Sequence, residues 1–274
     1  FRDYRFLWLG GFTAVITMWI RILVTTQWLQ EETGTAAALG VVGIVQLFVQ
    51  IPSLLYGGAL SDKIDRKKMM AAANSVSLIS LLVLGLLDAG GGLHLWMVYL
   101  SIAVMAGAQV MVNPARSALV PSVVPERHIM LAVTTDTATQ NTAMIVGPLL
   151  FAYVASVFGL TTVFFVGAVT AVPSVIAPLF IRAAGRAQGG STGSTLTRIR
   201  EGFWFIVRHP ILPGLFLLDT GNTVVSFYRE ILPALAVGLF RAGAGGTGVL
   251  GAANSAGAII GSMGALMFAG YRAK

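Results

Sequence analysis

The sequence has little charge and no cysteine. Asp, Glu, Lys and Arg make up 11% of its 274 residues, whereas a soluble domain has about a quarter of its residues charged. Hydrophobic residues make up 56% of the chain. Without cysteine the chain forms no disulfide bond and offers no thiolate to a metal ion or a substrate. These shortages exclude an ordinary soluble domain and predict an all-α integral membrane protein.

Several catalytic and energy-coupling motifs are also missing. The chain has no G-x-x-x-x-G-K-[ST] loop, which argues against an ATP-driven pump. It has no H-E-x-x-H, so we do not expect an enzyme. Its three histidines, His94, His128 and His209, are scattered among predicted loops, so no metal site is expected. No cofactor is implied.

Apolar runs of about 20 residues recur along the chain, and each is long enough to cross about 30 Å of hydrocarbon as a helix. The sequence predicts eight such spans, at about 6–29, 37–60, 69–88, 95–115, 132–157, 161–181, 211–237 and 247–270.

The connection at 182–210 is longer than the others. It contains the small, flexible stretch AGRAQGGSTGST, followed by hydrophobic residues at helical spacing. We therefore expect three regions. Residues 1–181 form a six-helix N-terminal half, 182–210 form a cytoplasmic linker with an amphipathic helix, and 211–274 form two further helices.

Basic residues predict the orientation of the spans. If the N-terminus is cytoplasmic, 15 of the 18 Lys and Arg residues fall on that side, as the positive-inside rule requires. These are Arg2, Arg5, Lys63, Arg66, Lys67, Lys68, Arg116, Arg127, Arg182, Arg186, Arg198, Arg200, Arg208, Arg272 and Lys274. Arg241 falls in an outer loop, and Arg21 and Arg229 lie within spans. The bias explains the net charge of +7 without a nucleic-acid partner.

One short loop is unusually rich in charge. In GALSDKIDRKK, which starts at Gly58, six of the seven residues from Asp62 to Lys68 are charged. This stretch resembles the loop between helices two and three of the major facilitator superfamily, commonly G-x-L-[AS]-D-[RK]-x-G-[RK]-[RK]. The matching residues are Gly58, Leu60, Ser61, Asp62, Lys63, Arg66 and Lys67. Asp65 stands where the family pattern has Gly.

Three further stretches are similar to the enterobactin-exporter and multidrug-efflux-like branch of that superfamily: NPARSALVPSVVP, VGP and REGFWFIVRHP. The resemblance implies a bundle of twelve helices in two halves that rock about a central site. This chain then holds about eight of the twelve, as a piece that is truncated at its C-terminus. The short matches between GALSDKIDRKK and GALMFAGYRAK agree with a parallel repeat of six helices.

The resemblance also implies a function. We expect a secondary active transporter in the inner membrane that exports small amphiphilic or drug-like molecules, or a siderophore. The alternative is a lipid or lysophospholipid transporter, or a non-transporting membrane receptor. Protons are a candidate coupling ion, but the antiporter signature is reduced to Gly147-Pro148, and the fourth span has no Arg before Arg116 at its cytoplasmic end. No oligomer is implied.

The resemblance also implies a role for the loop motif. It implies that Gly58, Leu60, Asp62, Lys63, Arg66 and Lys67 form a cytoplasmic latch between the two halves. The alternative is a plain basic loop that only anchors the cytoplasmic side.

Polar residues within the bilayer are costly, so they are functional candidates. Those at helical spacing on one face of a span are predicted to line a central cavity for substrate or protons. They are Arg21, Gln109, Asn113, Asp136, Gln140, Asp219, Asn222, Arg229 and Glu230. For Thr13, Thr17 and Thr25, which share a stripe with Arg21, ordinary hydrogen bonding is the better interpretation.

Two hypotheses follow from these residues. Arg21 and Glu230 lie at similar depths in spans one and seven, so we expect them to approach each other across the halves and close the outer gate. Arg229 neutralising Glu230 locally is the alternative. Asp136 and Asp219 are candidate proton carriers, because a poorly solvated carboxylate holds its proton more readily. Capping of its own helix is the alternative for Asp136.

Overall fold

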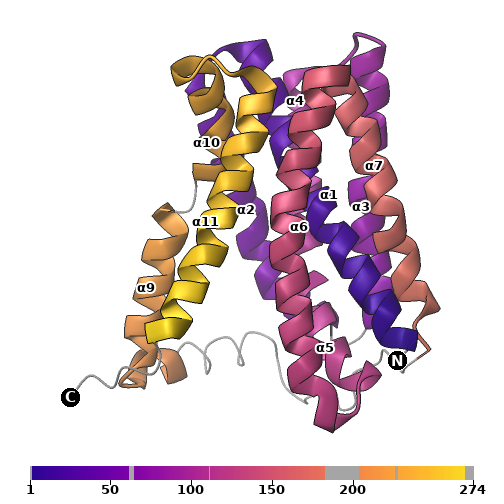
Figure 1. The fold of residues 1–274 in the computed structure, drawn as a ribbon, viewed down its shortest axis with the longest axis vertical. Coiled ribbons are helices and arrows are strands. Elements are labelled where there is room, and N and C mark those ends of the chain that lie inside the picture. The colour runs from indigo at the N-terminus through magenta and orange to yellow at the C-terminus, as the bar shows by residue number, and fades with distance from the viewer. Residues whose placement is uncertain (1, 62–64, 111, 183–203, 226–227, 269–274) are drawn as a thin grey trace.

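The computed structural model describes residues 2–61, 65–110, 112–182, 204–225 and 228–268 (Figure 1). Every regular element in these ranges is helical, which confirms the all-α prediction. In chain order they are α1 (Arg2–Thr33), α2 (Ala36–Ser61), α3 (Arg66–Ala89), α4 (Leu95–Gln109), α5 (Val112–Val123), η1 (Glu126–His128), α6 (Ile129–Phe158), α7 (Leu160–Ile176), η2 (Ala177–Phe180), α9 (Leu212–Val225), α10 (Tyr228–Ala234), the π-helical η3 (Leu235–Leu239) and α11 (Gly243–Phe268).

Four helical stretches are long and apolar enough to cross a membrane, by length and composition, within the described ranges. They are α1, α3, α6 with η1, and α7 with η2. Shorter apolar stretches occur in α2 and α4. In hydrocarbon a backbone must satisfy its own N–H and C=O groups, and a helix does so within one segment.

The predicted fourth span, 95–115, is not one helix. α4 ends at Gln109, and α5 begins at Val112 and continues to Val123. Pro114 explains the break, because proline has no N–H to donate to the carbonyl four residues earlier and its ring clashes with that carbonyl. The chain past Pro114 is therefore a separate helix that extends beyond the predicted boundary.

The predicted seventh span changes its helical geometry. Within the described residues α9 extends to Val225 and α10 starts at Tyr228, and the helix widens into η3 after Pro233. The wider turn is visible in the bond from the Phe240 N–H to the Leu235 carbonyl, 3.0 Å long. Such π turns relieve the lost hydrogen bond that a proline causes.

The N-terminal part of the bundle, α1–α7 with η1 and η2, is packed around α1. α1 contacts α6 and α7, α3 contacts α7, and α2 contacts α4. The core between these helices contains Trp19, Leu23, Phe151 and Phe164, none of which is more than 1% exposed. These apolar contacts fix the helices as one unit.

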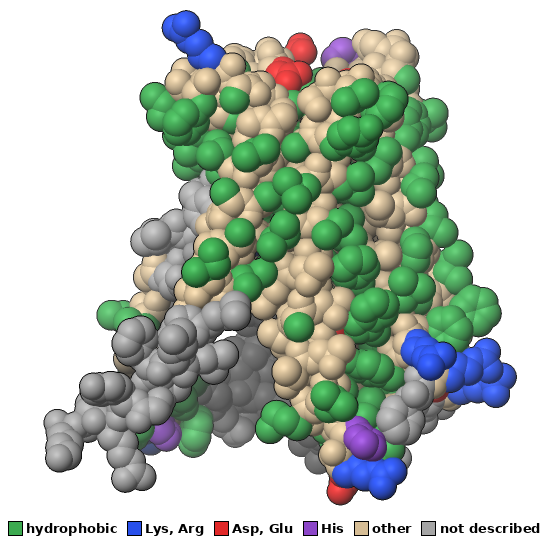
Figure 2. Space-filling view, in the orientation of Figure 1, with side chains coloured by type: hydrophobic (Ala, Val, Ile, Leu, Met, Phe, Trp, Pro, Cys, Tyr) green, Lys and Arg blue, Asp and Glu red, His purple; other side chains and the backbone are tan. Residues whose placement is uncertain are grey.

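The bundle has two chemically different ends. We call the end with the N-terminus the basic end. There Lys67 donates Nζ to the Ile181 carbonyl, and the Arg182 N–H donates to the Asp3 carboxylate. The other end, where Trp28, Asp88 and Thr161 meet, is the opposite end. On the face in Figure 2, hydrophobic side chains cover the middle, and charged side chains gather toward the two ends. Such a surface suits a lipid environment, as does Phe48, which is 78% exposed.

The C-terminal part, α9–α11 with η3, meets the N-terminal part unevenly. α10 packs on α1 and α2, and α11 packs along α6. α9 makes no extensive contact with another element in the described part of the chain, and Figure 1 shows it standing apart from α5 and α6. Most of the predicted amphipathic helix of the linker lies outside the described residues.

Candidate functional site

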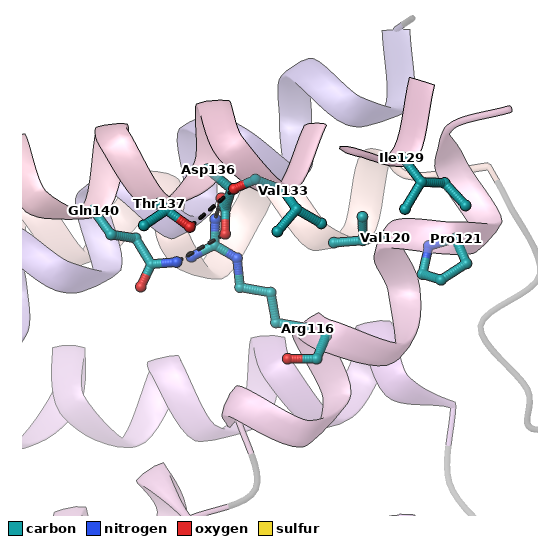
Figure 3. Close-up of a pocket in the computed structure, with 9 residues that line it drawn as sticks. Arg116, Val120, Pro121, Ile129, Val133, Asp136, Thr137 and Gln140 are labelled. Atoms are coloured by element: carbon teal, nitrogen blue, oxygen red, sulfur yellow. Dashed lines mark hydrogen bonds and ion pairs between the residues drawn. The ribbon is translucent and has the colours of Figure 1, made fainter. Parts of the chain in front are cut away.

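A buried ion pair joins α5 and α6 near the basic end (Figure 3). The guanidinium of Arg116 donates from Nη2 to Oδ1 of Asp136. Gln140 donates from Nε2 to the other carboxylate oxygen, 2.8 Å away. Arg116 is 8% exposed. Both oxygens of Asp136 are therefore bonded, which offsets much of the cost of burying its charge.

α1 is shaped to admit this pair. A Cβ atom on Gly11 would overlap the guanidinium of Arg116, so only glycine leaves room for it. Two hydrogen bonds join α1 to α6, with acceptors before and after Asp136. Tyr4 donates its hydroxyl to the Ala132 carbonyl at 3.0 Å, and Trp8 donates Nε1 to Thr139 Oγ1 at 2.8 Å. Three helices thus enclose the pair.

A cavity of about 460 Å³ opens beside the pair. Its lining mixes polar and apolar side chains, all of them from α5 and α6. It consists of Arg116, Ser117, Val120, Pro121, Ile129, Val133, Asp136, Thr137 and Gln140. Cavities of this size and mixed character hold small organic molecules.

The structure brings three of the candidate cavity residues close together. Asp136 and Gln140 line the large cavity, and Gln140 and Gln109 line a smaller one of about 40 Å³ beside it. Gln109 also donates Nε2 to Ser77 Oγ at 3.1 Å. The capping interpretation of Asp136 is wrong, because α6 begins at Ile129 and Asp136 lies two turns inside it.

The charge count placed Arg116 at the cytoplasmic end of the fourth span, just outside it, and did not predict its burial. The residue is buried in α5, where it pairs with Asp136. A signal was present, since Arg116 lies seven residues after Gln109 and three after Asn113, on the same helical face. The predicted span ended too early for that spacing to be used.

A second group of charges lies between the N-terminal and C-terminal parts. Arg21 of α1 and Glu230 of α10 are each 9% exposed. Their opposite charges attract each other. Among the described residues, however, an N···O distance within 4.0 Å is found for Arg116 with Asp136 and not for Arg21 with Glu230. The Arg229 guanidinium lies over the Trp19 ring, 5.3 Å from its centre. We call Trp19, Arg21, Arg229 and Glu230 the arginine cluster.

Three donors of the arginine cluster are buried without a hydrogen-bond partner: Nε of Arg21, Nε of Arg229 and Nε1 of Trp19. The geometry brings Arg21 and Glu230 to one interface, as the pairing hypothesis expects. It also places Arg229 close enough to attract Glu230, so the local alternative stands beside it.

α11 makes a closer contact across the two parts. Thr247 donates its hydroxyl to Oε1 of Gln27 at 2.6 Å, and both side chains are fully buried. A Cβ on Gly248 would come within 2.5 Å of the Pro148 carbonyl oxygen of α6. α11 therefore lies directly against the backbone of α6 near the opposite end.

The threonine stripe of α1 is held by hydrogen bonds. Thr13 and Thr25 donate to carbonyls one turn earlier, at 3.0 Å to Leu9 and 2.8 Å to Arg21. Thr17 shares a 3.0 Å bond with Thr170 of α7. These bonds agree with the ordinary interpretation. The side chains of three further candidates, Asn113, Asp219 and Asn222, lie outside the described residues.

The loop between α2 and α3 is described only in part. Asp62 and Lys63 lie outside the described residues, as do the side chains of Gly58 and Leu60. Asp65 caps α3, with backbone angles φ −61° and ψ 119°, and its carboxylate accepts the Lys67 N–H at 2.9 Å. A residue that caps a helix N-terminus explains an Asp where the family pattern has Gly.

Arg66 and Lys67 of the same motif begin α3. Lys67 donates Nζ to the Ile181 carbonyl at 3.1 Å, which ties α3 to the chain end of η2. This contact lies within the N-terminal part, so the latch role of these residues stays a prediction.

The fold agrees with what a comparison with known proteins finds. The family model described as Major Facilitator Superfamily matches residues 7–274. The chain belongs to this superfamily. It is accordingly a multi-pass membrane protein of a transporter family and not an enzyme.

Similar superfamily members are about a quarter identical to this chain over the aligned residues. An uncharacterized MFS-type transporter, YfiS, of Bacillus subtilis is 26% identical over 213 residues, which cover 74% of this chain and 48% of that protein. Macrolide efflux protein A of Streptococcus pyogenes is 26% identical over 179 residues, covering 64% and 44%. The chain thus spans about half the length of these relatives.

A solved structure agrees with the fold. The crystal structure of a POT family transporter in complex with a thioalcohol-conjugated peptide has a TM-score of 0.56 at 15% identity. It covers 87% of this chain and 50% of that one. At this identity the likeness bears on the fold alone.

Proposed function

We propose that this chain is part of a secondary transporter that exports small amphiphilic molecules by alternating access. Membership in the superfamily and the similarity to a macrolide efflux protein support the proposal. The observation that carries it is the uneven contact between the two parts. α10 and α11 close against α1 and α6 near the opposite end, while α9 stands apart at the basic end. This is the arrangement expected of a transporter closed on one side of the membrane.

We assign the basic end to the cytoplasm of a cell with an inner membrane, on the strength of the positive-inside rule. The cavity beside Arg116 and Asp136 then faces the side from which an exported molecule enters. Gln109, Asn113 and Gln140 are its proposed polar contacts, with Asp219 and Asn222 from the C-terminal part. Asp136 is a proposed proton carrier, since protonation would release Arg116 and change the charge of the cavity.

The contacts near the opposite end form the proposed outer gate. Arg21 and Glu230 attract each other across it, and the bond from Thr247 to Gln27 adds a neutral contact. On the cytoplasmic side, Gly58, Leu60, Asp62, Lys63, Arg66 and Lys67 form the proposed latch of the other state.

Transport by the full-length protein in everted membrane vesicles tests this function. In such vesicles an exporter fills the lumen, so a radiolabelled macrolide should accumulate when the lumen is acidified and be lost when a protonophore is added. Arg127→Gln, at an exposed position, is the matched control and should transport normally. Absence of gradient-driven accumulation of the macrolide would overturn the proposal. Movement of labelled lysophospholipid instead would favour the lipid alternative.

A charge swap tests the gate separately. Arg21→Glu and Glu230→Arg should each abolish accumulation, and the double variant should restore part of it because the attraction is rebuilt with reversed sign. If the double variant restores none, the pairing of these two residues is wrong.

A further inference from the structure

The arginine cluster contains more positive charge than its own residues neutralise. Two guanidiniums, of Arg21 and Arg229, face one carboxylate, that of Glu230. Arg21 and Glu230 are both nine-tenths buried. Charge buried in this way is stable only where a partner compensates it. Among the described residues of the cluster, one positive charge is left over.

The hydrogen bonds show the same shortage. Nε of Arg21 and Nε of Arg229 are buried and have no acceptor. A buried donor without an acceptor costs about 1–3 kcal/mol, and more when it is charged. Nε of Arg116 is also without an acceptor, but its guanidinium has a carboxylate of its own. The arginine cluster is therefore distinguished by its shortage of negative charge.

The position of Trp19 indicates which kind of partner the arginine cluster lacks. The Arg229 guanidinium lies over the Trp19 ring, with Cζ 5.3 Å from the ring centre. The ring face attracts the cation but accepts no ordinary hydrogen bond, so the guanidinium N–H donors still need an oxygen acceptor. A planar or tetrahedral oxyanion fits two such donors. A cation in the same place would be repelled by the surplus charge.

We propose that the arginine cluster binds an anionic oxygen group, a carboxylate or a phosphate-like group, on the transported molecule. The inference rests on the proposed transport function and adds acidic amphiphiles to its substrates. Arg21 lies in the second half of α1, toward the opposite end, and α1 and α10 belong to different parts of the bundle. An anion bound between them would neutralise the surplus charge as the parts rearrange. Glu230 competes with that anion for the two guanidiniums.

The experiment uses full-length protein in phosphatidylcholine nanodiscs, whose lipids carry no net charge. The probes are salicylate, its neutral amide salicylamide, and the cation benzylamine, each titrated while the melting temperature is followed. Salicylate should raise the melting temperature in a saturable way, and the other two should not. Arg21→Gln and Arg229→Gln should each weaken salicylate binding by about tenfold or more, which corresponds to one charged hydrogen bond.

The decisive variant is Glu230→Gln. It removes the competing carboxylate, so salicylate should bind severalfold more tightly than to the unchanged protein. A purely structural role for Glu230 predicts the reverse, namely weaker binding and a lower melting temperature. Arg241→Gln, at an exposed position near the opposite end, keeps the net-charge change of the arginine variants and should bind normally.

The outcomes separate this inference from the proposed function. Equal stabilisation by salicylate and salicylamide, or loss of salicylate binding in Glu230→Gln, overturns the anion site even when the vesicles accumulate macrolide. Selective salicylate binding without any transport would support the anion site and overturn the proposed transport function. If Arg21→Gln does not fold, Arg229→Gln and Glu230→Gln decide the question.

Discussion

Arg116 and Arg21 are both buried guanidiniums in one bundle, yet their surroundings differ. Arg116 touches the carboxylate of Asp136, and α1, α5 and α6 of the same part enclose the pair. Arg21 shares Glu230 with Arg229 across the boundary between the two parts. Nε has no acceptor in either Arg116 or Arg21, so the difference lies in the balance of charge.

The difference separates a pair whose charges are balanced from a cluster that has a charge left over. A one-to-one pair with both carboxylate oxygens bonded is stable while it stays closed, and its loss is costly. A cluster with surplus charge can bind a further anion, and the described contacts between the two parts around it lie toward the opposite end. We therefore expect Arg116 to dominate stability and Arg21 to dominate transport.

The largest effect on stability is expected at the balanced pair. Arg116→Ala leaves Asp136 buried without its cation, which costs about 3–5 kcal/mol of unfolding free energy. An unfolding titration with sodium dodecyl sulfate in mixed micelles measures it. The double variant Arg116→Ala/Asp136→Ala should lose much less than the two single variants added together. Strict additivity would show that the two residues are not coupled.

A smaller effect is expected where the two parts touch. Gly248→Leu places a side chain against the α6 backbone at Pro148 and costs about 1–3 kcal/mol by overpacking. It should also push α11 outward. Spin labels on Thr35→Cys and Arg241→Cys, near the opposite end, should then move apart by several ångströms.

Gly257→Leu is the matched control in the same helix, because a Cβ on Gly257 meets nothing within 4 Å. Equal spin-label distances in the two leucine variants would mean that the close approach of α11 to α6 does not hold the parts together.

Thr247→Val tests the neutral contact between the parts. It removes the hydroxyl that Gln27 accepts and leaves that amide oxygen buried, at a cost of about 1–3 kcal/mol. Adding Gln27→Leu should recover part of this loss, since no unpaired acceptor remains. No difference between the single variant and the unchanged protein would remove this bond from the gate.

The smallest change in stability is expected at Arg21. Arg21→Met removes a charge that lacks a partner of its own, so the unfolding free energy should change by less than about 1 kcal/mol, far less than for Arg116→Ala. Transport should nevertheless be lost. A destabilisation as large as that of Arg116→Ala would contradict the contrast between the two arginines.

Composition and periodicity predicted the helices well, because burial in lipid leaves a long apolar segment few alternatives. The family motif at Gly58–Lys67 placed the chain in its superfamily, which the family model confirms. The breaks near Pro114 and Pro233 were harder to predict. Proline is tolerated in membrane helices, so its presence alone does not tell whether a helix bends or ends.

The sites were less predictable than the helices. Polar spacing selected Asp136 and Gln140, but the partner of Asp136 came from a residue counted just outside the fourth span. Tertiary packing at Gly11 created the space for Arg116, and no local pattern reveals such a space. The bond between Gln27 and Thr247 joins residues 220 positions apart, which helical periodicity does not connect.

A reversible crosslink between the parts tests the central claim most directly. An ideal Cβ on Gly245 of α11 lies 3.7 Å from Cβ of Ser156 of α6, close to the separation of about 3.8 Å found in disulfides. Because this chain has no cysteine, Ser156→Cys/Gly245→Cys introduces one defined pair, and each single variant is a control. Alternating access predicts that oxidation stops macrolide accumulation in everted vesicles and that reduction restores it. Accumulation at the full rate with the crosslink fully formed would contradict the account.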